Sequence, residues 1–409
     1  MTKNTQETFF ALVRAGLWSH TDNTESTDIK VSGYRLKVKE SAIDWGEILR
    51  LAEEQSIIGL IADAIDRFKV SSADFCRDSA EPEQVRSSLA VPKVHDSRFM
   101  VPQVWALQFI GQTLQIEQQN KAMNQFLGEM VSKMRRAGIY TLLVKGQGVA
   151  QCYERPLWRS CGDIDFFFSE ENFKKAQDFL LPMSEHAEED HGSKHQEMVI
   201  NSWVVEIHGW LRGGISSRIN RVLDEVQTDT FNGGNVRSWD NNGVQIFMLG
   251  KENDVFYVFT HFLNHFFKGG VGLRQICDWC RLLWTYRDKI DVALLEKRLR
   301  KMDLMSEWKA FAALAVNTLG MPESAMPLYD PASKWSRKAE KILAFVLETG
   351  NFGHNRHRER PNSYIAKKAQ SLWRHTKDNL RQIAIFPLDS LRVWWGVFTN
   401  GLYEAVRGK

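Results

Sequence analysis

The sequence predicts an α+β protein in which a small mixed-sheet core is inserted between an N-terminal and a C-terminal helical region. Before residue 139 and after residue 250, apolar residues recur every three or four positions, as in helices buried on one face. Between these regions, short strand-like runs alternate with short helical runs, which is typical of a compact α/β unit. No repeat with a period of roughly 20 to 50 residues is visible, so a repeat array is excluded.

The first region, residues 1–138, is expected to be helical. FFALVRAGLW and WGEILRLAEEQSIIGLIADAIDRF both have helical spacing, and a polar, structure-poor stretch follows from Ser71 to about Asp96. After Pro102, the apolar residues of VWALQFIGQTLQIEQQNKAMNQFLGEMVSKMRRAG follow one long helix. Gly138 is expected to end that helix, because glycine readily adopts the left-handed conformation found after helix ends.

The second region, residues 139–250, is expected to contain the sheet. YTLLVKG reads as a strand that enters a glycine turn, GVAQCYE as a short helix and DIDFFF as a second strand. ENFKKAQDFLL then reads as a helix, and HQEMVI and WVVEIHGW as two further strands. A mixed sheet follows from this order.

The third region, residues 251–409, returns to helical spacing, from NDVFYVFTHFLNHFF to the final DSLRVWWGVFTNGLYEAVRG. Its aromatic end suits a core, a partner interface or a membrane surface, and is too short to span a bilayer. The basic segment 354–381 carries interleaved aromatic residues. A solvated helix face is the favoured interpretation of it, and binding to nucleic acid is the alternative.

Composition excludes several classes of protein. The 53 basic and 50 acidic residues leave a net charge of +3, too small to indicate nucleic-acid binding alone. No transmembrane stretch and no secretory signal is visible, so a cytoplasmic location is expected. Five cysteines in 409 residues argue against a disulfide framework. The pair in ICDWC is expected to be two helix cysteines rather than a zinc site, because no second pair is present.

Two aspartates in DIDFFF are the main candidates for catalytic residues. Side chains alternate along a strand, so Asp163 and Asp165 are expected on one face, where their charges repel unless a cation lies between them. In WVVEIHGW, Glu206 offers a third carboxylate, and His208 shares its face. Mg²⁺ prefers such oxygen ligands and shares them with substrate phosphates, which indicates phosphoryl or nucleotidyl transfer. The alternatives are a solvated sheet edge for the aspartates and a core group for His208.

The turn in LLVKGQGVA is a candidate phosphate site. Lys145 precedes it, and the backbone N–H groups of Gly146, Gln147 and Gly148 can cradle phosphate. Arg159 could neutralise phosphate charge through its planar guanidinium, or pair with Glu154 or Asp163 as a structural bridge. Lys145 could equally be a solvated residue at a strand end.

Two helical residue pairs in the third region are also candidates. His261 and His265 have the i, i+4 spacing of a metal pair, but no acidic residue lies between them, and helix packing is favoured. Arg274 and Asp278 have the same spacing and are expected to form an intrahelical ion pair, with lining of an acceptor cleft as the alternative.

Taken together, K-G, a short helix with a tyrosine, an arginine, G-D-I-D and V-E-I-H resemble the nucleotidyltransferase fold of the DNA polymerase beta superfamily. They are most similar to its branch of uncharacterised bacterial nucleotidyltransferases, over roughly residues 140–210. THFLNHFF and GVGLRQICDW resemble that branch's helical segment, and Arg159 matches its arginine. The turn departs from the pattern, because Gln147 stands where the superfamily has serine or a second glycine.

The resemblance implies a Mg²⁺-dependent enzyme, with Mn²⁺ as the alternative ion, that transfers a nucleoside monophosphate from an NTP to an acceptor hydroxyl and releases pyrophosphate. ATP is the expected NTP, and the acceptor stays open. Asp163, Asp165 and Glu206 would be metal ligands, and Gly146 would contact the triphosphate. A non-catalytic nucleotide-binding protein with the same fold is the second hypothesis, favoured by the unusual turn. An RNA-directed module that uses the basic segment is the third.

Overall fold

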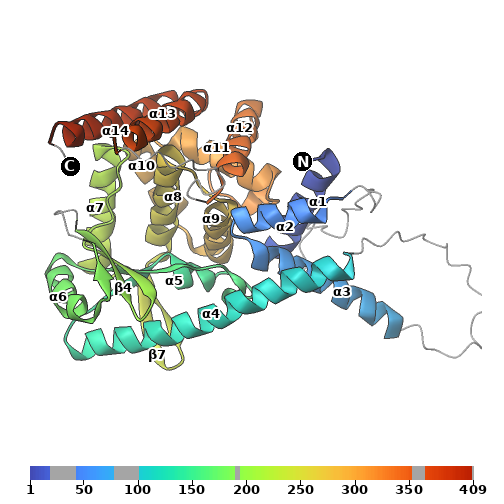
Figure 1. Ribbon diagram of the computed structural model, residues 1–409, viewed down its shortest axis with the longest axis horizontal. Helices are drawn as coiled ribbons and strands as arrows, with labels where there is room; N and C mark the ends of the chain where they lie inside the picture. Colours follow the sequence, from blue (N-terminus) through green and yellow to red (C-terminus); the bar gives the residue numbers. More distant parts are fainter. Residues whose placement is uncertain (19–42, 78–100, 189–193, 352–363, 408–409) are drawn as a thin grey trace, which may run out of the picture.

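The structure is a computed structural model that describes residues 1–18, 43–77, 101–188, 194–351 and 364–407. It confirms the predicted class, since a seven-stranded mixed sheet lies among many helices (Figure 1).

The N-terminal helices are α1 (Lys3–Leu17), α2 (Trp45–Glu54), α3 (Ile58–Arg77) and α4 (Gln103–Arg136). The predicted long helix is confirmed as α4, and Gly138 follows it with φ +73°. The predicted start of a structure-poor stretch at Ser71 is wrong, because α3 continues to Arg77; most of that stretch lies outside the described residues.

The sheet has the strand order β3-β4-β5-β2-β1-β7-β6. Its strands are β1 (Leu142–Val144), β2 (Asp163–Phe167), β3 (His186–Ala187), β4 (His195–Ile200), β5 (Trp203–His208), β6 (Val236–Asn241) and β7 (Val244–Leu249). The pairs β2–β5 and β1–β7 are parallel, and the other neighbouring pairs are antiparallel. Sequence reasoning missed the β6–β7 hairpin, although its turn residues Asn242 and Gly243 form an Asn-Gly pair with φ of 52° and 84°.

The two faces of the sheet contact different apolar clusters. Ile164 and Phe166 of β2 belong to a cluster that includes Met123 and Leu127 of α4 and residues of α6 (Glu170–Leu180). Phe167 projects to the opposite face and joins the larger cluster of the C-terminal helices. Figure 1 accordingly shows α4 along one side of the sheet, with α8 and α9 on the other. Asp163 and Asp165 lie four and two residues before Phe167 on β2. Their side chains therefore project from the same face as that of Phe167, toward α8 and α9.

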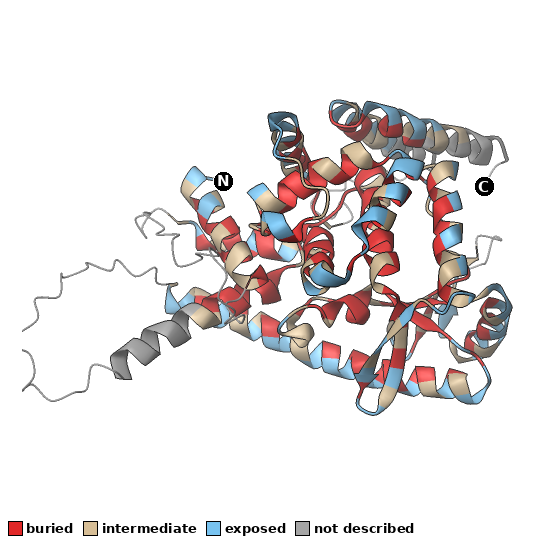
Figure 2. Ribbon diagram, turned by 180° about the vertical axis from the view of Figure 1, so that it is seen from behind, coloured by how far each residue is buried: buried red, intermediate tan, exposed pale blue. Residues whose placement is uncertain are grey.

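The remaining helices lie outside the sheet, and most of them contribute apolar residues to the larger cluster. They are α5 (Gly146–Ala150), α7 (Ser217–Phe231), α8 (Lys251–Lys268), α9 (Leu273–Tyr286), α10 (Val292–Met302), α11 (Met305–Asn317), α12 (Ser333–Thr349), α13 (Tyr364–Ile383) and α14 (Pro387–Arg407), with 3-10 turns η4 (Pro156–Trp158), η5 (Leu181–Met183), η6 (Arg287–Lys289) and η7 (Glu323–Ala325). Phe259 of α8, Trp279 of α9 and Trp308 of α11 pack edge to face or tilted at its centre. Figure 2 shows buried residues concentrated where these helices meet, and exposed residues along the outer side of α4. This packing joins α8 to α9 and α11.

The N-terminal helix α1 is bonded to the third region. The indole of Trp18, which follows α1, donates to the Leu319 carbonyl oxygen at 2.6 Å, and Arg14 donates to that of Thr318 at 3.0 Å. The apolar cluster on this side includes residues from Phe9 to Val393. The division into residues 1–138, 139–250 and 251–409 stays a prediction.

Other expectations concern the surface and the cysteines. None of the helices in the described ranges is both long and apolar enough to cross a bilayer, and a cytoplasmic location stays a prediction. Cys152, Cys161, Cys277 and Cys280 are buried free thiols, and the last two lie inside α9 as predicted. Residues 354–363 of the basic segment lie outside the described residues; its remainder belongs to α13, where Trp373 is exposed.

Candidate active site

The three predicted carboxylates lie on one face of neighbouring strands. Strand β2 pairs with β5 in parallel, and Asp165 is the direct partner of Glu206. Asp163 lies two positions earlier on β2, so its side chain projects from the same face. Asp165 is almost fully buried, whereas Asp163 and Glu206 keep partial access to solvent. The register of one strand pair therefore brings the three carboxylates together.

A lysine supplies the positive charge that this cluster needs. Lys145 follows β1, and its ammonium lies 2.6 Å from Asp165 Oδ1 and 3.4 Å from Nε2 of His261. The Lys145 backbone has φ 57° and ψ −144°, a conformation that is rare for a residue with a Cβ. Such strain persists only where the surrounding structure enforces it, and it is common at functional sites. The turn thus aims the Lys145 side chain at the carboxylates rather than into solvent.

Two histidines complete the polar cluster. His208 is buried, and its Nε2 lies 3.0 Å from Asp165 Oδ1 and 3.4 Å from Glu206 Oε2. His195 is the antiparallel partner of His208 on β4, and its Nε2 lies 3.2 Å from the same Glu206 oxygen. The prediction for His208 as a substrate contact is not tested by these distances, which show that it contacts two of the carboxylates.

The charges in this cluster shift one another's pKa values. The negative charge of Asp165, assisted by burial, raises the pKa of Asp163. Burial opposes ionisation of Glu206, but hydrogen bonds from His195 and His208 outweigh it and hold the Glu206 pKa well below its usual range. Burial likewise opposes the charge on Lys145, yet Asp165 raises the pKa of the ammonium overall. The cluster is therefore a buried, charged network that already includes a cation.

The glycine turn differs from the expected phosphate cradle in one respect. The side-chain amide of Gln147 is buried and donates to Asn120 Oδ1 on α4 at 2.7 Å. Gln147 therefore ties α5 to α4. Gly146 has φ +41°, in the left-handed region that favours glycine, and a Cβ on Gly148 would lie 2.8 Å from Met248 Sδ, so this side chain would have to shift.

Arg159 forms a buried bridge with an unexpected partner. Its Nε and Nη2 donate to the two carboxylate oxygens of Asp278 at 2.8 and 2.6 Å, and both side chains are about 5% exposed. The Tyr153 hydroxyl donates to the same carboxylate at 2.9 Å. Neither Glu154 nor Asp163, the two partners considered, takes part. The prediction of an Arg274–Asp278 ion pair is wrong, because Asp278 is occupied by Arg159 across the interface between η4 and α9.

Arg274 instead lines a pocket together with Asp163 and Asp165. Its Nη1 donates to the Ser160 carbonyl oxygen at 2.7 Å, and its buried Nε has no hydrogen-bond partner among the described residues. His261 and His265, for which helix packing was favoured, have their Nε2 atoms 2.9 Å apart and lie beside Lys145. Burial and the nearby ammonium of Lys145 lower the pKa values of both, that of His265 to about 4. Both are therefore neutral near pH 7.

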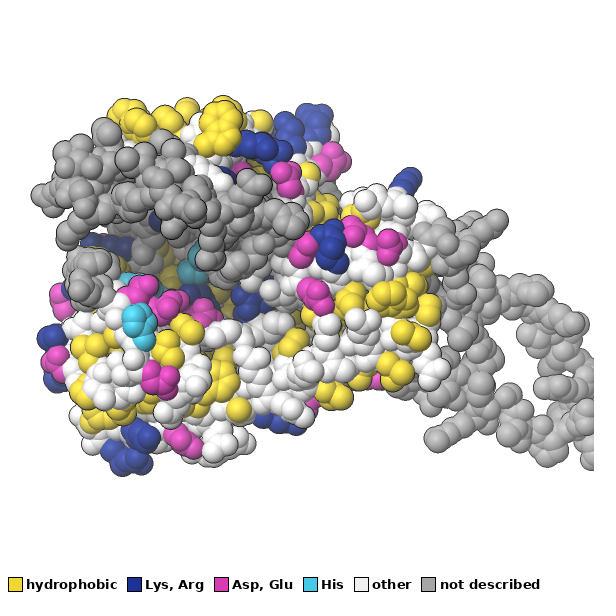
Figure 3. All heavy atoms as spheres, in the orientation of Figure 1, with side chains coloured by type: hydrophobic (Ala, Val, Ile, Leu, Met, Phe, Trp, Pro, Cys, Tyr) yellow, Lys and Arg dark blue, Asp and Glu magenta, His cyan; other side chains and the backbone are white. Residues whose placement is uncertain are grey.

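Two pockets meet at the cluster. The larger, of about 1150 Å³, is lined by His195, Glu206, His208, Trp210 and Tyr257 among others. The smaller, of about 470 Å³, is lined by Gly146, Arg159, Asp165, Arg274 and others; Lys145, Asp163 and His261 line both. Figure 3 shows acidic and histidine side chains gathered at the rim of a hollow on this face.

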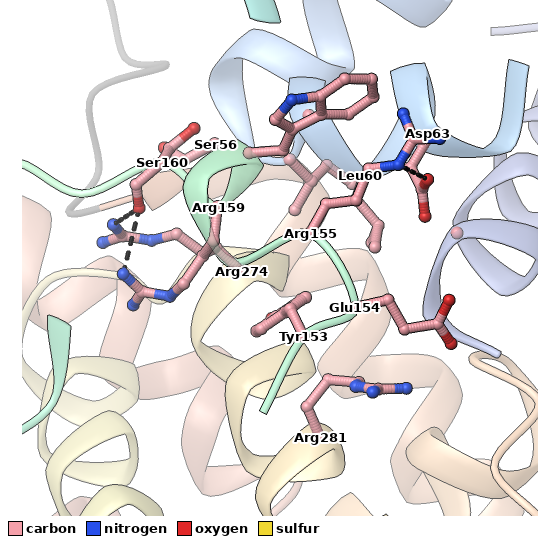
Figure 4. Close-up of a pocket in the computed structure, with 14 residues that line it drawn as sticks. Ser56, Leu60, Asp63, Tyr153, Glu154, Arg155, Arg159, Ser160, Arg274 and Arg281 are labelled. Atoms are coloured by element: carbon pink, nitrogen blue, oxygen red, sulfur yellow. Dashed lines mark hydrogen bonds and ion pairs between the residues drawn. The ribbon is translucent and has the colours of Figure 1, made fainter. Parts of the chain in front are cut away.

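A third pocket, of about 440 Å³, lies on the other side of Arg159 and contains four arginines (Figure 4). Arg159 and Arg274 both point to the Ser160 carbonyl oxygen there. Arg155 pairs with Asp63 and Asp66, and Arg281 donates to two backbone carbonyls. Protein groups engage Arg155, Arg159 and Arg281, so we interpret this pocket as a scaffold for the loop before β2, whereas the Nε of Arg274 has no partner among the described residues.

Sequence reasoning missed His195 and Tyr257, whereas Arg274, considered as a cleft-lining residue, does line the smaller pocket. A signal for His195 exists: Asn201 and Ser202 form a two-residue turn with positive φ, and a hairpin closed there pairs residue 195 with 208. Tyr257 carries no such signal, because its place depends on how α8 packs on the sheet.

A protein family matches most of the chain. A family model described as "uncharacterised nucleotidyltransferase" matches residues 41–320. Among solved structures, the chain is similar to an antigenic nucleotidyltransferase-like protein from Paracoccidioides brasiliensis, with 12% identity and a TM-score of 0.28, over 45% of this chain and 90% of that one. At that score the structural likeness carries no argument. No curated protein matches the chain.

Proposed function

The chain belongs to a family of uncharacterised nucleotidyltransferases, and from this premise we propose that it transfers a nucleoside monophosphate from an NTP, ATP first, to an acceptor hydroxyl. Pyrophosphate is the leaving group. The observation that carries the proposal is the convergence of Asp163, Asp165 and Glu206 on one sheet face where two pockets meet. The order of turn, Asp-x-Asp strand and later carboxylate also supports membership of the DNA polymerase beta superfamily and its bacterial branch, as part of this proposal.

The residues present fit a divalent metal. Asp163, Asp165 and Glu206 offer hard carboxylate oxygens of the kind that Mg²⁺ and Mn²⁺ prefer. The ammonium of Lys145 lies 2.6 Å from Asp165, so a metal ion bound to this carboxylate would displace it. When bound, the metal would supply Lewis-acid stabilisation of the phosphate charge and lower the pKa of the acceptor oxygen.

The chain's own groups would position the substrates. We assign the polyphosphate to the smaller pocket, because Gly146 and Arg274 line it and Arg274 has an uncommitted Nε. The backbone N–H groups from Gly146 to Gly148 belong to the first turn of α5 and have no acceptor within the helix. Lys145 lies between the pockets, where it can pair with phosphate once metal takes its place on Asp165. Arg159 is held by Asp278 and would act by positioning the loop before β2.

The larger pocket suits the nucleoside and the acceptor. Trp210 and Tyr257 line it and offer aromatic faces for a base or sugar. Glu206 faces it with a strongly depressed pKa, so its carboxylate is ionised and can hold the acceptor hydroxyl by a hydrogen bond. We do not assign the acceptor, because the shape of the pocket, and not the fold, decides which acceptor binds.

A nucleotide-binding protein without turnover is the second candidate. The Lys145–Asp165 ion pair favours it, because an ammonium on a metal-ligand carboxylate competes with the ion. Calorimetry with ATP and Mg²⁺ separates the two candidates, since affinity without product formation supports binding alone.

The test is label transfer. The purified chain, incubated with α-labelled NTPs, Mg²⁺ and cell extract, should transfer label and release pyrophosphate. Asp163→Asn combined with Asp165→Asn should abolish both, and Asp178→Asn, an exposed aspartate of α6, should leave them unchanged. Transfer at the wild-type rate in the double variant would refute the assignment.

A further inference from the structure

His195, Glu206 and His208 form a compact ligand set that the carboxylate site does not explain. Their metal-binding atoms all lie within 4.8 Å of one another. Glu206 Oε2 is 3.2 Å from His195 Nε2 and 3.4 Å from His208 Nε2, so a single carboxylate oxygen lies next to both imidazole nitrogens. Nucleotidyl transfer on magnesium requires oxygen ligands, and imidazole is not among those Mg²⁺ prefers.

These distances agree with the shell of a small transition-metal ion. Ligand atoms on a tetrahedral ion with bonds of about 2.0–2.1 Å lie roughly 3.3–3.4 Å apart. The two contacts of Glu206 Oε2 have this length, and small side-chain rotations can close the remaining span between the imidazoles. Two histidines and one glutamate around an open position are the ligand set of catalytic zinc sites.

The backbone holds the ligands in this arrangement. His195 and His208 are direct partners in the antiparallel pair β4–β5, and Glu206 is two residues from His208 on the same face. Ligands on paired strands keep their relative positions better than ligands on loops. The large pocket reaches all three side chains, which provides an entry path for an ion.

We propose that His195, Glu206 and His208 bind a divalent transition-metal ion of the Zn²⁺ class next to the Asp163–Asp165 pair. The proposal rests on the proposed function, because it makes this ion one of the metals of the same site. Asp165 connects the two, since its Oδ1 lies 3.0 Å from His208 Nε2. The enzyme would then differ from an all-carboxylate, magnesium-only nucleotidyltransferase.

Metal binding by the full chain, freed of metal with a chelator, tests this directly. Calorimetric titration should give an affinity for Zn²⁺ at least about 100-fold above that for Mg²⁺, as imidazole ligands favour. Co²⁺ alone should produce the intense visible absorption of a tetrahedral site with nitrogen ligands. His195→Ala should lower Zn²⁺ affinity about tenfold or more and change Mg²⁺ affinity less than twofold.

The controls separate this proposal from the proposed function. His186→Ala, an exposed histidine on the neighbouring strand β3, should change neither affinity. No variant of His208 is used, because this side chain is buried and its loss can disturb folding. His195→Asn serves as the second variant instead. Co²⁺ absorption that His195→Ala abolishes supports the proposal even if no nucleotidyl transfer is found. Mg²⁺-supported transfer by a protein whose Zn²⁺ affinity is unchanged in His195→Ala overturns it and leaves the proposed function standing.

Discussion

The ammonium of Lys145 lies 2.6 Å from Asp165 Oδ1, so a cation of the protein occupies one side of the carboxylate cluster. Both side chains are largely shielded from solvent, with 15% and 2% exposed. A buried charge that loses its partner is strongly destabilising, whereas a replacement cation restores the balance. Folding stability and metal binding are therefore expected to be coupled through this pair.

Lys145→Met should expose that coupling. In chelator, the free energy of unfolding should fall by about 3 kcal/mol, because three carboxylates are left without their ammonium. Saturating divalent metal should recover most of the loss, since the ion takes the ammonium's place. Urea unfolding with and without metal measures both effects. Lys174→Met, at a lysine of α6 that is 70% exposed, is the control, and a Lys145→Met defect that metal leaves unchanged would contradict the coupling.

The buried Arg159–Asp278 bridge should dominate the stability of the loop before β2. Asp278→Asn and Arg159→Met should each cost about 3–5 kcal/mol, because each leaves an unpaired buried group. The double variant should cost less than the sum by at least about 1 kcal/mol, as expected for residues in direct contact. A double-mutant cycle in urea measures this coupling; strict additivity would show that the two side chains do not depend on each other.

Arg274→Ala should weaken nucleotide binding. A hydrogen bond between a charged group and phosphate contributes about 1.5–3 kcal/mol, so kcat/KM for NTP should fall roughly 10- to 100-fold, mostly through KM. Steady-state rates of pyrophosphate release measure it. Arg300→Ala, at an exposed arginine of α10, should leave the kinetics unchanged. An equal fall in both variants would remove Arg274 from the phosphate site.

Glu307 should make stability fall as pH rises. Burial in α11, with the charge of Asp389 nearby, raises the Glu307 pKa to about 8. A carboxyl whose pKa is raised by folding stabilises the folded state while both states are protonated. That stability is lost between about pH 4.5, where the unfolded chain ionises, and about pH 8.

Glu307→Gln should therefore be more stable than the wild type by several kcal/mol at pH 8.5, at about 1.4 kcal/mol for each unit of pKa difference. The gain should shrink toward pH 5. Urea unfolding at pH 5, 7 and 8.5 gives the comparison. Glu323→Gln, at an exposed position, should show no such trend. A gain that is the same at each pH would mean that ionisation of Glu307 is not its cause.

Gly16 should be intolerant of a methyl group. A Cβ there would lie 2.2 Å from the Leu60 carbonyl oxygen, where α1 crosses α3. Gly16→Ala should destabilise the protein by about 1–3 kcal/mol through overpacking. Gly111→Ala, in α4 with nothing within 4 Å, should stabilise it by about 0.5–1 kcal/mol through helix propensity. Thermal unfolding of the two variants tests the contrast, and a stable Gly16→Ala would show that the helices can separate at this crossing.

The sequence alone determined the features that depend on local periodicity. The long helix α4, the strand that carries Asp163 and Asp165, and the strand that carries Glu206 follow from spacings of 3.6 and 2 residues. The same alternation put the carboxylates on one face of their strands. The hairpin of β6 and β7 was missed, although its Asn-Gly turn was there to be read.

Only the tertiary structure decided which groups surround those carboxylates. Lys145 meets Asp165, Arg159 meets Asp278, and His261 lies at the site rather than merely within a helix interface. Asp278 is 119 residues from Arg159, and no local pattern links them. Such pairs arise because helices α8 and α9 bury their apolar stripes against the sheet, and packing of whole elements, not propensity along the chain, fixes which side chains are brought into contact.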